Sequence, residues 1–350
     1  MKSRLLAAAL VLGLGLAGTA RSETLDITIG AGPADNHAPV FVAVEKGFFA
    51  DAGLNPKVIL YPTGVEEVNG QVNGAQQVSV LGTAPFLSGI SNGLPLVLIA
   101  QLSGNPLKDS YSGNQALVAA LGAGIAEGHL EALKGKRIAL PFGTDAQTYV
   151  VNLLTQAGLK PSDVRLSNGQ PAQLVTALSN GDADVISIWE PWSSAAVLNV
   201  KGAVKVIEGG CNACFMPATV LTSRKVIDQD KETLSRFVVA FARAAQWVRQ
   251  HPDEAAEIDT HWIQGTSLEV LKASIRHSVF DPRLSKAVEE GFVSKTIPQL
   301  VAAHALRQAV DPSKSIDPEF ILETEQKDPQ FFSDLPLIPE QLRLRTAAGG

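Results

Sequence analysis

The sequence is poor in the residues that carry redox and metal chemistry. Only two of its 350 residues are cysteine and two are methionine, and aromatic residues make up 6%. The six histidines show no paired spacing of the kind that binds metals, so we expect no metal site. The glycine-rich loops contain neither a phosphate-binding lysine nor a dinucleotide fingerprint. These absences argue against nucleotide chemistry, and we expect no cofactor.

Positive charge is also scarce, because acidic residues outnumber basic ones by 35 to 29. A surface with this balance repels nucleic acid and anionic lipid. We therefore expect no nucleic-acid partner.

Long hydrophobic runs are missing, and the apolar stretch nearest the N-terminus covers only residues 5–16. It follows Lys2 and Arg4 and precedes Ala20-Arg21-Ser22, which is typical of a signal peptide over residues 1–22. Twelve residues are too few to span a bilayer, and no cysteine near the cleavage region offers a lipid anchor. The sequence predicts a soluble periplasmic protein with 26 basic and 35 acidic residues.

The stretch from Gly181 to Trp192 combines a helix end, a strand and a polar, aromatic segment. Gly181 is typical of a helix terminus, and the β-branched residues 185–188 predict a buried strand. Trp189, Glu190 and Trp192 then lie at the carboxyl end of that strand, where open α/β sheets bind ligands. The alternative is that both indoles belong to the core and that Glu190 only favours the start of a helix.

The same pattern occurs earlier in the chain, at residues 74–85, and the segments Ala52-Gly53-Leu54 and Ala157-Gly158-Leu159 extend the match. Two similar α/β lobes are implied, each an open, mostly parallel sheet with loops at its strand ends. We expect residues 23–114 to form the first part of lobe I and residues 115–218 to form lobe II. Residues 219–350 are expected to return to lobe I and to add helices.

Cys211 and Cys214 are the only cysteines, and they lie three positions apart. In an oxidising compartment such a pair predicts a local disulfide. A role in ligand contact is the alternative.

Several motifs occur in an order that resembles one protein family. They are the segment from Ala38 to Phe49, Ala52-Gly53-Leu54, Gly82-Thr83-Ala84-Pro85, Trp189-Glu190-Pro191-Trp192, and the segment 236–254. The chain resembles the periplasmic binding proteins of nitrate, sulfonate and taurine ABC transporters, a grouping that also contains thiamine-pyrimidine (NMT1/THI5-like) relatives.

The resemblance implies a two-lobed, type II periplasmic binding protein with a ligand in the cleft between the lobes. It implies a monomer that delivers a small solute to a permease in the inner membrane, with no catalytic residues. Carried over by position, it implies these ligand-binding residues: Asn36, His37, Tyr61, Thr63, Thr83, Ala84, Asn105, Thr144, Gln147, Trp189 and Glu190.

The ligand class stays open. Helix starts near Thr83 and Thr144 favour an anionic group, Glu190 favours a cationic or N–H donor group, and the indoles favour a flat or apolar part. Taurine fits all three features, alkyl sulfonates fit two, and a pyrimidine or a nitrate-like anion is the alternative. A pyrimidine-synthase-like enzyme on the same scaffold is the alternative of another class.

Overall fold

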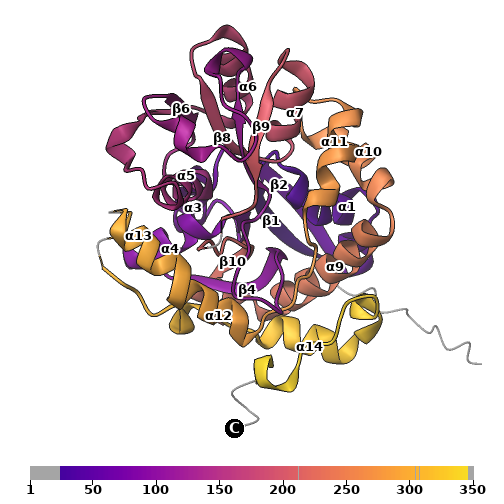
Figure 1. Cartoon of the computed structure of the whole chain (residues 1–350). Helices are drawn as coiled ribbons and strands as arrows, with labels where there is room; N and C mark the ends of the chain where they lie inside the picture. Colours follow the sequence, from indigo (N-terminus) through magenta and orange to yellow (C-terminus); the bar gives the residue numbers. More distant parts are fainter. Residues whose placement is uncertain (1–23, 212, 304, 307, 346–350) are drawn as a thin grey trace, which may run out of the picture.

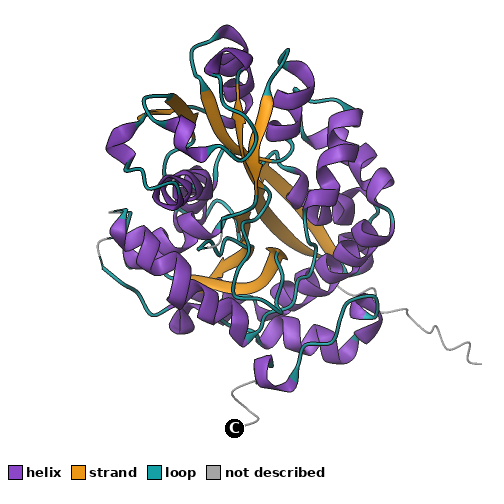
Figure 2. Cartoon of the chain, viewed as in Figure 1, coloured by secondary structure: helices purple, strands orange, loops and turns teal. Residues whose placement is uncertain are grey.

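The computed structural model describes residues 24–345 except 212, 304 and 307. The expected signal peptide, residues 1–22, lies outside the described residues. Two five-stranded sheets form the centre of the molecule, and helices cover them (Figures 1 and 2). The prediction of an α/β fold with two sheets flanked by helices is confirmed.

The first sheet has the order β2 (Leu54–Leu60), β1 (Leu25–Ala31), β3 (Val78–Leu81), β10 (Ala218–Ser223) and β4 (Leu96–Ser103). β1 pairs in parallel with β2 and β3, whereas β10 is antiparallel to both β3 and β4. Four strands therefore run in one direction, and their carboxyl ends meet at one edge of the sheet.

The second sheet repeats this arrangement with the order β7 (Arg165–Asn168), β6 (Arg137–Leu140), β8 (Val185–Trp189), β5 (Gln115–Ala119) and β9 (Val204–Glu208). β6 is parallel to β7 and β8, and β5 is antiparallel to β8 and β9. In each sheet the fourth strand is thus the reversed one. The internal repeat in the sequence corresponds to this shared topology.

Helices within the two halves follow the strands. They are α1 (Ala38–Glu45), α2 (Phe48–Asp51), α3 (Gly64–Val72) and α4 (Thr83–Ser91), then α5 (Asp145–Gln156), α6 (Pro171–Asn180) and α7 (Trp192–Asn199). α6 ends at Gly181, whose φ of 77° is the left-handed conformation that glycine adopts readily. This agrees with the helix end expected from the sequence.

The C-terminal part is helical and packs mainly on the first sheet and its helices (Figure 1). Its helices are α8 (Arg224–Gln229), α9 (Lys231–Gln250), α10 (Pro252–Trp262), α11 (Leu268–Ser274), α12 (Lys286–Gly291), α13 (Ile297–Ala302) and α14 (Glu319–Lys327). α9 contacts α1 and α2, and the ring centroids of Phe237 and Phe49 are 5.5 Å apart. None of the helices in the described part of the chain is long and apolar enough to cross a bilayer.

One expected helix is shorter than the sequence pattern predicts. The sequence pattern of residues 298–309 predicts a helix over that whole segment, but α13 ends at Ala302. The backbone N–H groups of Ala305 and Leu306 both donate to the carbonyl of Leu300, which turns the chain back. Leu306 becomes 4% exposed, so burial of its side chain accompanies the end of the helix.

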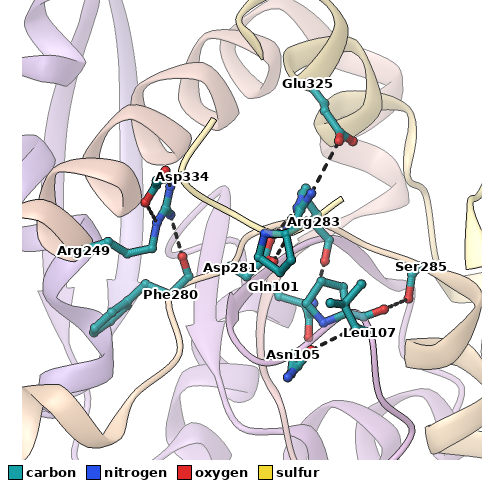
Figure 3. A network of polar contacts seen from close by, with 12 residues as sticks. Gln101, Asn105, Leu107, Arg249, Phe280, Asp281, Arg283, Ser285, Glu325 and Asp334 are labelled. Atoms are coloured by element: carbon teal, nitrogen blue, oxygen red, sulfur yellow. Dashed lines mark hydrogen bonds and ion pairs between the residues drawn. The ribbon is translucent and has the colours of Figure 1, made fainter. Parts of the chain in front are cut away.

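A polar network joins the end of β4 to the C-terminal segment 279–285 (Figure 3). Gln101 Nε2 donates to the carbonyl of Arg283, and the Arg283 guanidinium is paired with Asp281 at 2.7 Å. Glu325 on α14 lies 3.8 Å from the same guanidinium. This network holds one strand end of the first sheet in a fixed position beside the region described next.

Candidate functional site

A cavity lies where the carboxyl ends of strands from both sheets face one another. Its volume is about 70 Å3, counted as space that the centre of a water molecule can occupy. The residues that line it are Gly32, Pro33, Ala34, Asn36, His37, Pro62, Thr63, Gly64, Glu67, Leu81, Gly82, Pro85, Ser103, Gly113, Asn114, Gln115, Thr144, Asp145, Trp189, Met216 and Ala218.

The topology explains why these residues meet. Gly32, Thr63 and Gly82 follow β1, β2 and β3, while Thr144 follows β6 and Trp189 ends β8. The reversed strands β10 and β5 begin at the same edges, so Ala218 and Gln115 join them. Parallel α/β sheets place ligands at this edge. The cavity therefore draws its wall from both halves of the chain.

His37 lines the cavity as a neutral imidazole. Its Nδ1 accepts a hydrogen bond from the backbone N–H of Gly32 at 2.8 Å, which leaves the proton on Nε2. Burial lowers the pKa of His37 to about 3, because the charged form loses its hydration. The side chain thus offers no positive charge at neutral pH.

Asp145 joins the two halves across the cavity. It is the first residue of α5, and its carboxylate accepts hydrogen bonds from the backbone N–H groups of Thr83 and Ala84 at 3.0 and 2.7 Å. These N–H groups belong to the first turn of α4. A Cβ on Gly82 would lie 2.3 Å from Asp145 Oδ2, so the close approach requires glycine.

The Asp145 carboxyl is fully enclosed, and burial raises its pKa to about 6, although the two backbone donors lower it in part. A negative charge at the N-terminus of a helix is stabilised by the helix dipole. The first turn of α4 is therefore occupied by a group of the protein itself.

Glu67 is a second carboxyl in the cavity wall. It lies on α3, is 1% exposed, and its Oε1 accepts from the backbone N–H of Val80 at 2.7 Å. Burial raises the pKa of Glu67 well above its ordinary value. No Lys or Arg is among the described residues that line the cavity. The wall is thus neutral or acidic.

Five of the residues expected to bind a ligand line this cavity, namely Asn36, His37, Thr63, Thr144 and Trp189. Trp189 is half-buried at the end of β8. Trp192, in contrast, is 2% exposed and belongs to the hydrophobic core. The two indoles of one motif therefore have different surroundings.

The other expected residues are not among those that line it. Thr83 and Ala84 hold Asp145 through their backbone, while the Tyr61 hydroxyl donates to Gln76 Oε1 at 2.9 Å. Asn105 Oδ1 accepts from the N–H of Leu107 at 3.0 Å and so closes a turn (Figure 3). Gln147 Oε1 accepts from Gly143 N at 2.8 Å. Each of these side chains has a local structural partner.

Glu190 is 0% exposed and is also absent from the cavity wall. Its carboxylate accepts from the N–H and hydroxyl of Ser194 at 3.0 and 2.9 Å and from Lys205 Nζ at 3.2 Å. Lys205 also donates to Glu208 at 2.9 Å, and His277 pairs with Glu208. The carboxylate of Glu190 is therefore satisfied inside the protein.

This cluster also contains ligand types that metals use. Glu190, Glu208 and His277 have ligand atoms within 4.8 Å of one another. Lys205 already donates to both carboxylates, and a like-charged ion would have to displace its ammonium group. We therefore assign the cluster to charge pairing between β9 and the segment after α11.

Cys211 and Cys214 are joined in a disulfide, with Cα atoms 5.3 Å apart. Both are buried, and neither lines the cavity. Replacing both with serine is expected to lower the free energy of unfolding by about 2 kcal/mol, because so short a loop restricts the unfolded chain little. The affinity for a solute should change little. Urea denaturation and calorimetry of the double variant check this, and lost binding in a folded variant would contradict it.

Sequence reasoning missed several residues of the wall. Ser103, Asn114, Gln115 and Met216 lie at strand ends or beside them, so a search extended to both ends of every strand would have found them. Glu67 lies one turn inside a helix, where no strand-end rule applies.

Two mixed sheets with a shared cavity at their strand ends define the two-lobed fold of type II periplasmic binding proteins. The family described as NMT1/THI5 like matches residues 34–255. The chain belongs to this family.

Comparisons with known proteins agree with the fold. The putative aliphatic sulfonates-binding protein of Bacillus subtilis is 28% identical over 253 residues, which cover 71% of this chain and 74% of that protein. The alkanesulfonate-binding protein SsuA of Xanthomonas axonopodis pv. citri, solved with bound MOPS, matches with a TM-score of 0.72 at 19% identity. The match covers 85% of this chain and 99% of SsuA.

The same scaffold also occurs in an enzyme. The desulfurization enzyme DszB matches with a TM-score of 0.63 at 17% identity, covering 87% of this chain and 99% of DszB. The fold alone therefore does not separate binding from catalysis. By fold, cavity and family, the chain is a solute-binding protein.

Proposed function

We propose that this protein is the periplasmic solute-binding component of an ABC importer, which captures a small organic solute and delivers it to a membrane permease. The observation that carries the proposal is the cavity of about 70 Å3 between the strand ends of both sheets. The sulfonate-binding relatives favour a sulfonate-type solute, and taurine is our first candidate in that class.

In this proposal, lobe I of the protein consists of residues 23–114 and 219–350, and lobe II consists of residues 115–218. The chain crosses between them near residues 110–118 and 215–223, and these crossings act as the hinge. Asp145 and the first turn of α4 meet across the lobes, which is the contact expected of a closed state. The sulfonate-binding relatives support capture of a small solute.

Binding without turnover separates this function from an enzyme on the same scaffold. Catalysis requires a positioned acid, base or nucleophile that is free to act. In the wall, His37 accepts a backbone N–H, and Asp145 and Glu67 likewise accept backbone N–H groups. We therefore propose that the protein is not an enzyme.

The test is mass spectrometry of the solute that co-purifies, with small-angle scattering before and after the solute is removed. We expect stoichiometric retention of an unaltered solute and a larger radius of gyration for the empty protein. Conversion of the solute, or failure to retain any small molecule, would contradict the proposal.

A further inference from the structure

The N-terminus of α4 is the place in this cavity where an anion would gain most from backbone N–H groups. It is taken by the carboxylate of Asp145, which bonds two consecutive N–H groups at 3.0 and 2.7 Å. An anionic solute would have to displace this carboxylate or lie beside it. Either course costs free energy, because like charges repel strongly where water is excluded.

Glu67 is an independent observation at the same cavity. Its carboxyl is buried, receives one backbone hydrogen bond, and forms no ion pair among the described residues. Since the described wall contains no Lys or Arg and His37 is neutral, no protein cation balances a solute anion there. A cationic solute would instead find two carboxyl groups.

We propose that Asp145 and Glu67 make the site selective for a solute that brings an amino group or other N–H donors, and against a solute whose only charge is negative. This inference rests on the proposed function and specifies the solute class. A zwitterion such as taurine qualifies through its amine, whereas an alkanesulfonate or nitrate does not.

Protonation gives the proposal a second signature. Burial raises the pKa of Glu67, which favours its protonated form in the free protein, whereas a bound ammonium group favours the ionised form. Burial also raises the pKa of Asp145 to about 6, so the affinity for ethylamine, which has no sulfonate, should rise as pH increases from 5 to 8. An anion beside Asp145 would require its carboxylate to take up a proton, and its affinity should fall over the same range.

The experiment uses titration calorimetry with taurine, ethylamine, ethanesulfonate and nitrate, since the first three share a two-carbon skeleton. We expect the wild-type protein to bind taurine or ethylamine at least tenfold more tightly than ethanesulfonate and nitrate. Glu67→Gln should lower the amine affinity about tenfold, and Asp145→Asn should raise ethanesulfonate affinity about tenfold. Asp163→Asn is the matched control. Asp163 also accepts a backbone N–H, that of Lys160 at 2.8 Å, but it does not line the cavity.

The wild-type pH series needs no variant and decides the case even if a substitution prevents folding. Ethanesulfonate or nitrate binding as tightly as the amines, or ethylamine affinity that falls with pH, would overturn this inference and leave the proposed function intact. If none of the four binds, a co-purified solute with an amino group or other N–H donors would support the inference, and one whose only charge is negative would overturn it. If the protein also retains no solute on purification, both proposals are overturned.

Discussion

Replacing Asp281 with alanine is expected to lower the free energy of unfolding by about 3 to 5 kcal/mol, as for other buried pairs that lose one partner. The side chains of Arg283 and Asp281 are 3% and 4% exposed, and their closest atoms are 2.7 Å apart. Arg283 Nε also donates to Asp281 Oδ1 at 2.9 Å. Without Asp281, the buried guanidinium keeps a hydrogen bond to the carbonyl of Pro336 at 2.8 Å and a longer contact with Glu325 at 3.8 Å, but it loses its paired carboxylate. Urea denaturation measures the loss.

Asp253 provides the matched control. It pairs with Arg276 at a similar distance, 2.8 Å, but both side chains are more than half exposed. Water screens this pair, so Asp253→Ala should cost at most about 1 kcal/mol. If Asp253→Ala and Asp281→Ala lowered the free energy of unfolding equally, burial would not make the Arg283–Asp281 pair more important for stability than an exposed pair.

Replacing Glu190 with alanine is expected to lower the free energy of unfolding by about 2 to 4 kcal/mol, with little effect on which solute binds. The substitution leaves the buried N–H and hydroxyl of Ser194 without their acceptor, and it removes one partner of Lys205. An unsatisfied buried donor costs about 1 to 3 kcal/mol, and the lost charge pair adds to this. Urea denaturation and calorimetry with taurine and ethanesulfonate separate stability from selectivity.

Glu131 on the same half of the chain is a suitable control, because its pair with His129 is mostly exposed. Glu131→Ala should leave both stability and binding unchanged. A folded Glu190→Ala protein with altered preference between the two solutes would place this carboxylate in contact with the solute, as the sequence alone had favoured.

The strand-end rule accounts for what could be predicted of the site. Thr63 and Trp189 were found because polar or aromatic residues occur at or just after strand ends, and strand ends of one sheet share an edge. The repeated motif predicted two similar sheets, and each has its reversed strand in the fourth position. These features depend on local patterns that the sequence displays directly.

The direction of a side chain at such an edge depends on the hydrogen-bond partners that the folded structure brings next to it. Tyr61 turns to Gln76, and Glu190 turns to Ser194 and Lys205. No local sequence pattern distinguishes a carboxylate that binds a solute from one that is paired with a lysine of the same protein. Sequence reasoning could therefore place Glu190 at the strand end but could not orient it.

In α3 the apolar residues mark the buried face only in part, because Val68 is buried at 6% exposure but the other two valines are not. Val65 and Val72 are 38% and 47% exposed, whereas Glu67 and Gln71 are 1% and 4% exposed. The buried face of this helix carries polar side chains that form hydrogen bonds with β3. Glu67 accepts from the backbone N–H of Val80, and Gln71 accepts from the hydroxyl of Ser79. Periodicity places apolar residues inside, so it assigns Glu67 to the wrong face.

The position of β10 also sets an order of events during synthesis. β10 separates β3 from β4 in the first sheet, yet it is made about 110 residues after β4. At about 5 to 20 residues per second, this interval lasts roughly 5 to 25 s. Through that time the facing edges of β3 and β4 lack their shared neighbour, while all five strands of the second sheet are made by residue 208. The half of the protein that is synthesised first is thus the half whose sheet closes last, and its open strand edges are the ones exposed to wrong pairing in the meantime.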